Sequence, residues 1–550
     1  MSARAGYLGS GTFALIDGAG SCTSGLGILV CGPFGLEGIT ATRPLREWAR
    51  ALAADGHLVL RIDLPGTGDS AGGPRDAGLV SRWQQALADG VALLRQDHGV
   101  TRVAVIGVGL GGLLALTTEA PVDDVVAWGV PADGRRLVRE LRAFARFEAV
   151  RQDEAGGVVA GGYVMTAETA EALGQIDLRA LPAGALDRRR VLLVSRGDAA
   201  PDDELPAALS AAGAVVDTAA GPDFTAMTGD AAHARTPVQT IPVVGAWLGA
   251  AVGAQAGHEA PLLEPALTGG GVREEPAWIA LPGAELFAIH TGPADAKPGV
   301  DGLLFLNAGA LNRTGPNRLW VQIARRWAER GVPSLRVDLA GIGESDGDTG
   351  ELDDDAGFYR DLYVDQVLEL LDALERRWGI RRVAVIGLCS GAYTALHVAA
   401  ADDRVVSAVM LNPRALIWDQ RLVYRRNLRR ARKIVLPRTW HKVPHRRREA
   451  VATLSAVRSA GLGRRQDLDA AIRTLLDRVA ERGARVLLLF SGEEPLDREL
   501  AAKGLWDELE RWPAIRHERL AEHPETHTLR PLPIQATVIE RIDEALGDVF

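Results

Sequence analysis

The stretch Arg382-Val-Ala-Val-Ile-Gly-Leu-Cys-Ser-Gly-Ala392 decides the fold of this 550-residue chain. Its apolar first part is typical of a buried strand, and residues 392–400 have the pattern of a helix. Glycines on both sides of Cys389 allow a sharp turn between the two. This is the arrangement of a nucleophile elbow, G-x-S-x-G, with sulfur in the central place. At the N-terminal end of a helix a thiol is favoured as thiolate, the form that attacks carbonyl carbons.

The chain repeats its sequence once. Residues 58–70 match residues 334–345 at an offset of 275, and residues 101–107 match residues 381–387 at an offset of 280. A third pair of matching strands is offset by 295, which indicates an insertion after the second elbow. A chain of this length fits two domains. We therefore expect one domain at 1–250, an Ala-, Gly- and Pro-rich linker at 251–274, and a second domain at 275–550 with a cap at about 414–480.

Both halves alternate short Val, Leu and Ile runs with segments of helical periodicity, such as residues 45–54 and 319–330. This alternation predicts the α/β class: two tandem domains, each a mainly parallel sheet flanked by helices. Residues 6–15 and 277–290 open the two halves and alternate like antiparallel edge strands. The second domain is expected to carry a helical, basic cap.

A carboxylate follows the elbow at the place where such a site needs its acid. The strand expected at 485–490 leads into Ser491-Gly-Glu-Glu-Pro-Leu-Asp497. Because the acid that orients a catalytic histidine lies at the tip of such a strand, Glu494 is the first candidate. Asp497 is the second candidate and Asp419 the third.

A histidine comes next along the chain, in the order nucleophile, acid, histidine. His527 lies in the loop before the last predicted helix (534–546), and His523 is the near alternative. His527 would take the thiol proton and later protonate the leaving group. The acid would fix the tautomer of the ring and stabilise the imidazolium.

Two backbone amides are needed to stabilise the oxyanion. One is the amide of Ser390, directly after the nucleophile. The other is expected in the loop 307–310, from Ala308 or Gly309, because small residues permit close approach of the backbone. The nearby segment 338–343, with its aspartate and glycines, is interpreted as a tight structural turn.

The first copy has no nucleophile at its elbow. It reads Gly107-Val-Gly-Leu-Gly111, with Gly109 in the place of Cys389. Covalent catalysis at that position is therefore excluded. His233 and Asp198 or Asp203 are interpreted either as relics of a site or as core and surface polar groups. We interpret this copy as a pseudo-hydrolase domain that supports, docks or gates the second.

These residues carry a resemblance to known families. Both halves resemble α/β-hydrolases of the serine aminopeptidase-like branch, through the two elbows and the segments 63–70 and 338–345. The second half is similar to hydrolases associated with exosortases and polysaccharide loci, through Gly387–Ala392, Leu411–Pro413, Phe490–Glu494 and His527-Thr528. The resemblance implies the nucleophile Cys389, the acid Glu494 and the base His527. The acid is a glutamate, whereas an aspartate is usual in this fold.

Composition limits the environment and the partners. Cys22, Cys31 and Cys389 are too few and too scattered for a disulfide framework or a zinc site, and no metal or organic cofactor is indicated. No apolar run reaches the roughly 18 residues that span a bilayer, and no signal-peptide pattern follows Met1. We expect a cytoplasmic protein. The net charge of −9 and the lack of a binding motif argue against nucleic acid.

The insertion in the second half is strongly basic. Residues 421–448 hold twelve Arg or Lys and no acidic residue, with apolar residues at helical spacing. We expect a basic cap helix that binds an acidic acyl carrier protein or the phosphates of coenzyme A. Peripheral contact with an anionic membrane is the alternative. The residues expected to bind the partner are Arg425, Arg426, Arg429 and Arg430.

Together these features predict a Cys-dependent hydrolase or acyltransferase. Its substrate would be an ester or thioester, preferably of a carrier- or CoA-bound acyl group, and Cys389 would carry the acyl intermediate. Two alternatives stay open: an esterase or amidase on a small metabolite, and a non-catalytic scaffold in a biosynthetic complex.

Overall fold

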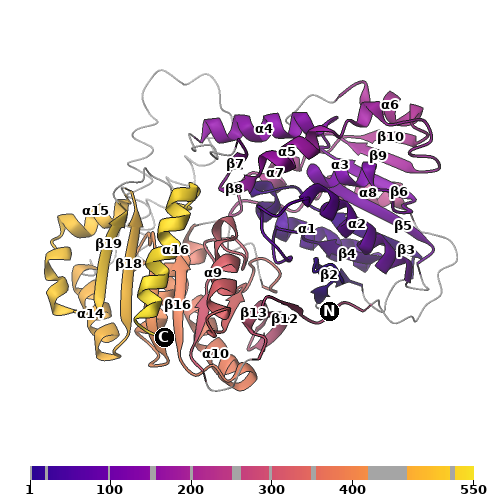
Figure 1. The fold of residues 1–550 in the computed structure, drawn as a ribbon. Helices are drawn as coiled ribbons and strands as arrows, with labels where there is room; N and C mark the ends of the chain where they lie inside the picture. The colour runs from indigo at the N-terminus through magenta and orange to yellow at the C-terminus, as the bar shows by residue number, and fades with distance from the viewer. Residues whose placement is uncertain are drawn as a thin grey trace, which may run out of the picture.

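The computed structural model describes two halves of the chain with gaps between described ranges. These ranges are 3–18, 23–96, 100–148, 156–197, 202–249, 262–295, 300–347, 355–418, 468–492, 494–520 and 527–550. The first half (3–249) and the second half (262–550) each contain one large sheet with helices on both faces, and they lie side by side (Figure 1). The predicted fold class, two α/β domains with mainly parallel sheets, is confirmed. Among the described residues, no helix combines the length and the hydropathy that crossing a bilayer requires.

The first sheet has the strand order β1-β2-β4-β3-β5-β6-β9-β10 and is parallel except at β1 and β2. Its strands are β1 (Arg4–Tyr7), β2 (Phe13–Asp17), β3 (Leu26–Cys31), β4 (Leu58–Ile62), β5 (Arg102–Val108), β6 (Asp124–Trp128), β9 (Arg190–Val194) and β10 (Val215–Ala219). The helices are α1 (Leu36–Ala54), α2 (Leu79–Gln96), α3 (Leu110–Thr117), α4 (Gly134–Phe147), α5 (Ala167–Gly174), α6 (Leu205–Ala211), α7 (Phe224–Thr228) and α8 (Thr240–Leu248). A separate hairpin, β7 (Val158–Ala160) and β8 (Tyr163–Met165), follows α4.

The second sheet repeats this plan in the order β11-β12-β13-β15-β14-β16-β17-β18-β19. Its strands are β11 (Leu267–Gly269), β12 (Val272–Leu281), β13 (Ala284–Pro293), β14 (Gly302–Phe305), β15 (Ser334–Val337), β16 (Val383–Leu388), β17 (Val405–Leu411), β18 (Arg485–Ser491) and β19 (Ile515–Leu520). The main helices are α9 (Leu319–Ala328), α10 (Asp361–Trp378), α11 (Ser390–Ala399), α14 (Leu468–Glu481), α15 (Pro495–Ala502) and α16 (Leu532–Gly547).

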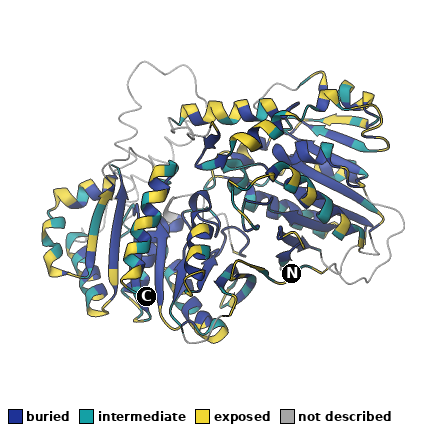
Figure 2. Ribbon diagram, viewed as in Figure 1, coloured by how far each residue is buried: buried dark blue, intermediate teal, exposed yellow. Residues whose placement is uncertain are grey.

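The core of the second half lies on both faces of its sheet, as alternation along β14 shows. Leu303 and Phe305 pack with α9 and α16, whereas Leu304 packs on the opposite face with α10 and α11. A strand covered on both faces is apolar throughout, which explains the continuous Val and Leu runs of the sequence. In Figure 2 the central strands are buried and exposed residues gather on the outer faces of the helices.

The linker predicted for 251–274 ends earlier than expected. Leu267–Gly269 form the edge strand β11, and β12 already begins at Val272. Glu264 also bridges to Tyr7 of the first half. These residues pair because the antiparallel hairpin β12–β13 extends to Val272 and Pro293 and offers its edge to a further strand. Residues 250–261 lie outside the described part of the chain.

Buried charged side chains join the two halves. Arg318 donates to the carbonyl oxygens of Gly66, Gly68, Ser70 and Gly72 at 2.6–3.1 Å. Arg313 lies 2.6 Å from Asp69 of the first half and 2.8 Å from Asp338 of its own half. Because buried charges are retained only when paired, these contacts fix how the halves dock.

Candidate active site

Cys389 occupies a strained turn between β16 and α11. Its φ is +59° and its ψ is −112°, a conformation that L residues rarely adopt. The flanking glycines make the turn possible: a Cβ on Gly387 would lie 2.2 Å from the backbone of Gly391, and one on Gly391 would lie 2.4 Å from the Asn307 carbonyl oxygen. The predicted strand–turn–helix around Cys389 is therefore present, and it lifts the thiol to the start of α11.

His527 and Glu494 meet as the sequence predicted. The ring nitrogen Nδ1 of His527 donates to Oε1 of Glu494 at 3.1 Å. The Glu494 side chain is 8% exposed and that of His527 is 21% exposed. Nε2 of His527 is buried, and no group among the described residues makes a hydrogen bond with it. Glu494 thus holds the proton on Nδ1 and leaves Nε2 to accept one.

The Cys389 thiol and the His527 ring affect each other's ionisation. Burial acts to raise the pKa of Cys389, but His527, Arg414 and Tyr359 outweigh it, so the pKa lies below its ordinary value. Burial acts to lower the pKa of His527, but Cys389 and Glu494 raise it to about 9. Each group therefore favours the charged form of the other, because a thiolate and an imidazolium attract.

Asn412 holds the loop of the histidine. It follows β17 with a φ of +43°. Its side-chain amide donates to Oγ of Ser491 at 2.7 Å and to the carbonyl oxygen of His527 at 3.0 Å. Its own oxygen accepts from the backbone N–H of Ser491 at 2.7 Å. Asn412 therefore ties the ends of β17 and β18 to the His527 loop.

The residues predicted for the oxyanion hole lie beside Cys389. Ser390, Ala308 and Gly309 all line the cavity at the thiol. Gly309 has a φ of +57°, and its N–H donates to the Ser390 hydroxyl at 3.0 Å. If the Gly309 amide receives the oxyanion, the Ser390 hydroxyl must give up this bond. The Ala308 amide is the alternative donor.

Two neighbours of the thiol were not predicted from the sequence. The hydroxyl of Tyr359 lies 3.6 Å from Sγ of Cys389, and its ring stacks on Trp418 with centroids 3.9 Å apart. Arg414 lines the same cavity and acts on the pKa of both Cys389 and His527. Tyr359 comes from a segment without a motif, whereas Arg414 directly follows Asn412-Pro413, a stretch already singled out.

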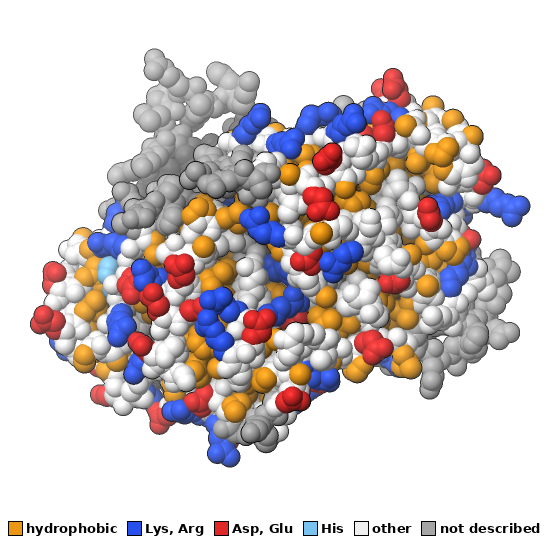
Figure 3. Space-filling view, viewed as in Figure 1, with side chains coloured by type: hydrophobic (Ala, Val, Ile, Leu, Met, Phe, Trp, Pro, Cys, Tyr) orange, Lys and Arg blue, Asp and Glu red, His pale blue; other side chains and the backbone are white. Residues whose placement is uncertain are grey.

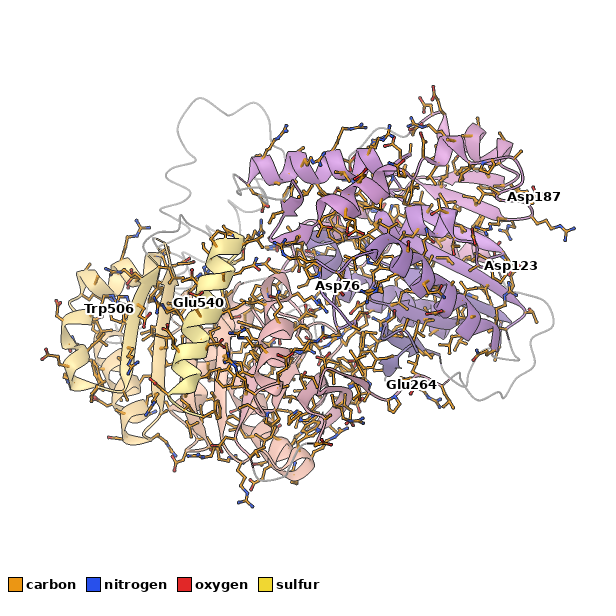
Figure 4. The ribbon with its side chains drawn as sticks, in the orientation of Figure 1. Asp76, Asp123, Asp187, Glu264, Trp506 and Glu540 are labelled. Carbon is orange, nitrogen blue, oxygen red and sulfur yellow. The ribbon has the colours of Figure 1, made fainter. Side chains whose placement is uncertain are left out.

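Asp497, the second candidate acid, belongs to another network. Its carboxylate accepts from Nε2 of His517 at 2.8 Å and from Nε1 of Trp506 at 3.0 Å, and it pairs with Arg519. Trp506 lies on the side of the second half away from the first (Figure 4). Asp497 therefore braces β19 and α15 and does not contact His527.

Several predicted residues lie outside the described part of the chain. They are Cys22, Asp198, Asp419, His523 and the partner-binding arginines Arg425, Arg426, Arg429 and Arg430. The basic section of the predicted cap falls in the same range.

The segment 338–343 forms the turn that the sequence indicated. Asp338 accepts from the backbone N–H groups of Arg313 at 2.6 Å and Glu344 at 3.0 Å. Gly341 and Gly343 have φ values of +79° and +52°. A buried aspartate that accepts these bonds closes the turn at the boundary between the halves.

The first half keeps the shape of an elbow without its chemistry. Gly109 has φ +55° and ψ −113°, close to the values at Cys389. His233 is 63% exposed and lies 3.7 Å from Asp230, and Asp203 is exposed. His233 does line a cavity, but it is the cavity of Cys389.

That cavity has a volume of about 290 Å³ and is shared between the halves. The second half contributes Cys389 and His527. The first half contributes residues of α1 and β8 and the loop 229–233. We refer to it as the Cys389 cavity. A molecule that filled this cavity would therefore touch both halves.

Two family models match the chain. A model described as "Alpha/beta hydrolase family" matches residues 303–530, and a model described as "alpha/beta hydrolase fold" matches residues 36–121. The first match contains Cys389, Glu494 and His527, and the second contains the elbow at Gly109. The matches thus fall on the two halves of the repeat. No curated protein matches the chain.

Solved structures resemble one half at a time. Est1E from Butyrivibrio proteoclasticus, solved with ferulic acid bound, is 16% identical, with a TM-score of 0.34 over 50% of this chain and 98% of its own. The dienelactone hydrolase from Anabaena variabilis is 15% identical, with a TM-score of 0.33 over 50% and 98%. The proline iminopeptidase from Mycobacterium smegmatis is 19% identical, with a TM-score of 0.30 over 50% and 100%.

Proposed function

We propose that this chain, a hydrolase with two α/β-hydrolase domains, transfers or hydrolyses acyl groups of esters or thioesters through a covalent intermediate on Cys389. The observation that carries the proposal is the arrangement at the elbow. A thiol with a lowered pKa lies beside His527, whose Nδ1 is bonded to Glu494. Nucleophile, base and orienting acid are the three parts of a covalent acyl-transfer site.

The chemistry follows from the positions of these groups. The Cys389 thiolate attacks the carbonyl carbon, and the amides of Ser390 and of Ala308 or Gly309 stabilise the oxyanion. A carbon–sulfur bond forms, the bond to the leaving group breaks, and the His527 imidazolium gives its proton to the leaving oxygen or sulfur. Water, an alcohol or an amine then loses a proton to His527 and attacks the thioester, which releases the Cys389 thiolate.

A thiol nucleophile suits a thioester substrate. Exchange of an acyl group between two thiols replaces one thioester by another, so the step is close to balanced in energy. An acyl carrier protein or coenzyme A would present such a thioester together with negative charge. The preferred substrate of this proposal is therefore a carrier- or CoA-bound acyl group.

Positive charge gathers on α4, close to this site. The helix has a single acidic residue, Glu140, and its exposed arginines lie along one face at a spacing of three or four residues (Figure 3). They are Arg135, Arg139, Arg142 and Arg146. In a chain of net charge −9, this stripe attracts an acidic partner.

The stripe leads toward the Cys389 cavity. Glu148, at the C-terminal end of α4, pairs with Arg530, and Arg530 lines the cavity. Phe147, between the stripe and this pair, is 88% exposed. An acidic carrier that docks on α4 would bring its thioester to the entrance of the cavity. This supports delivery of the acyl group by a carrier.

Intact-mass measurement tests the covalent step. The protein, in a Cys22→Ser background, is mixed with a panel of acyl-pantetheine thioesters, next to Cys389→Ala and His527→Ala. Cys31 serves as an internal control, because burial raises the pKa of its thiol to about 12. We expect an acyl adduct that Cys389→Ala lacks.

The other outcomes separate the alternatives. If Cys389 forms no adduct and also resists iodoacetamide, the chain is a scaffold and the proposal is wrong. If the thiol reacts with iodoacetamide but with no thioester, the substrate class is wrong, and small esters and amides become the next panel.

Carrier delivery has its own test. The variant Arg139→Gln/Arg142→Gln should raise KM for an acyl carrier protein substrate severalfold and leave KM for the same acyl-pantetheine unchanged. Arg516→Gln, at an exposed arginine of β19, is the matched control. Equal effects of the α4 variant on both substrates contradict docking on α4. If the α4 variant raises KM only when the substrate is presented in anionic vesicles, the membrane alternative is favoured.

A further inference from the structure

One wall of the Cys389 cavity comes from the first half of the chain. Leu36 and Ile39 reach it from the start of α1, and Tyr163 reaches it from β8. The loop 229–233 closes it with Ala231 and Ala232. A half without a nucleophile therefore supplies a surface to the site of the other half.

One part of this wall is apolar. Leu36, Ile39, Ala231 and Ala232 carry no polar side-chain atom, and the second half adds Leu311 to the same cavity. The rest of the wall is polar, with Thr40, Asp230 and His233. Apolar surface in a partly enclosed cavity binds hydrocarbon by removing it from water. The apolar part of the lining thus fits an aliphatic acyl chain.

We propose that the first half of the chain forms the acyl-chain subsite for Cys389 and sets the chain length that the site accepts. This inference rests on the proposed function and names the group that the site holds. The nucleophile and base belong to the second half, and the subsite belongs to both.

The loop 229–233 is held in place by specific contacts. Arg43 of α1 donates to the carbonyl oxygen of Ala234 at 2.5 Å. Ala232 packs against the hydrophobic core of the second half. Across the boundary, the Asn312 side-chain amide donates to Oγ1 of Thr42 at 3.1 Å. A wall fixed to both halves can discriminate between chains, because it cannot move away from a chain that is too long.

The hairpin β7–β8 fixes the other side. Gln535 of α16 donates to the carbonyl oxygen of Gly162 at 3.2 Å, and Val159 and Val164 pack against Leu532. The pair between Glu148 and Arg530 lies next to this contact and contributes charge at the cavity. The polar end of a substrate would therefore lie toward the arginine, with its chain toward Leu36 and Ala232.

Two variants of opposite effect test the subsite. Ala232→Phe fills the cavity from the first half, and Leu36→Ala enlarges it. Ala211→Phe, at an exposed alanine of α6 in the same half, is the matched control. Acetyl-, hexanoyl- and dodecanoyl-pantetheine are compared by kcat/KM, with the rate of Cys389 alkylation by iodoacetamide as a measure of the intact thiol.

We expect Ala232→Phe to lower kcat/KM for the dodecanoyl substrate about tenfold or more, since loss of contact with two methylenes is enough for that. The acetyl substrate and the alkylation rate should change less than about twofold, a difference below 0.5 kcal/mol on the same scale. Leu36→Ala should shift the preference toward the dodecanoyl chain.

Failure of the inference and failure of the proposed function give different results. If wild type and folded variants share one chain-length profile while Cys389 still acylates, the first half does not set chain length and the inference is wrong. If wild type forms no acyl adduct on Cys389 at all, the proposed function is wrong and the subsite falls with it. Circular dichroism identifies a variant that has not folded. The chain-length profile of the other variant then decides whether the first half sets the chain length.

Discussion

Arg61 of β4 and Glu344 of the second half form a buried two-bonded ion pair, with N–O distances of 2.7 and 2.8 Å. The same pair recurs with the halves exchanged, between Arg336 of β15 and Asp69. Arg61 and Arg336 are 275 residues apart, as are Asp69 and Glu344. Reciprocal contacts of equivalent residues are what a two-fold dimer makes. The repeat therefore docks onto itself like two subunits joined in one chain.

Removing one partner of this pair should destabilise the protein strongly. Arg61→Met leaves the Glu344 carboxylate buried without its main partner, which costs about 3–5 kcal/mol. The free energy of unfolding in urea measures the loss. Arg382→Met is the control, because the Arg382–Asp301 pair is exposed and contributes about 0–1 kcal/mol. Equal effects of the two substitutions would show that the buried pair does not hold the halves together.

The same pair predicts how stability depends on pH. Burial acts to raise the pKa of Glu344, but Arg61 outweighs it and the pKa lies below its usual value. A carboxyl with a lowered folded-state pKa stabilises the fold above its unfolded pKa, and this stability is lost as pH falls through the folded pKa. Wild type should therefore lose more stability between neutral and acidic pH than Arg61→Met. Parallel curves of unfolding free energy against pH would contradict this assignment.

The ionisation of Cys389 depends on His527. His527, Arg414 and Tyr359 together outweigh burial and hold the pKa of the Cys389 thiol below its ordinary value. The midpoint of the iodoacetamide alkylation rate against pH should therefore lie below that of a free cysteine. In His527→Ala the burial remains and the partner is gone, so the midpoint of the rate against pH should move upward. Tyr359→Phe should move it in the same direction by less. An unchanged midpoint in His527→Ala would mean that the two side chains do not form an ion pair.

Glu494 and Asp497 can be separated by isosteric substitution. Glu494→Gln keeps the shape but presents an amide to Nδ1 of His527, so turnover should fall by about 10²–10⁴-fold. Asp497→Asn removes the charge that pairs with Arg519 and weakens the bond to His517, so it should lower the midpoint of thermal unfolding with little change in turnover. Turnover of both variants is measured with the same acyl-pantetheine. The reverse pattern would assign the acid to Asp497.

Local pattern was sufficient to predict the elbow and its partners in the chain. Gly387, Cys389 and Gly391 define the turn by their spacing, and Glu494 and His527 follow at the ends of predicted elements. These features depend on residues near in sequence or on the fixed order of strands. Their catalytic roles stay a prediction that the experiments above decide.

The docking of the halves could not be predicted in the same way. The match between residues 58–70 and 334–345 indicated a repeat. The sequence of one copy does not indicate, however, that Arg61 pairs with a residue of the other copy. Side chains such as Tyr163 and Ala232 line the Cys389 cavity only because the two copies face each other. Periodicity reports which residues are buried and not against which distant segment they pack.

Restoring sulfur to the first elbow should not restore a site. Gly109→Cys has room, since a Cβ there would meet Pro33 at an ordinary 3.5 Å. Its positive φ imposes the same strained backbone that Cys389 already adopts. Among the described residues of the first half, however, no pair corresponds to His527–Glu494: His233 is exposed and lines the other cavity. In a Cys389→Ala background, Gly109→Cys should fold, show an ordinary thiol pKa by pH-dependent alkylation, and form no acyl adduct by intact mass. An adduct on the introduced thiol would show that the first half needs only a nucleophile to act, and its role as a wall of the Cys389 cavity would then be secondary to a site of its own.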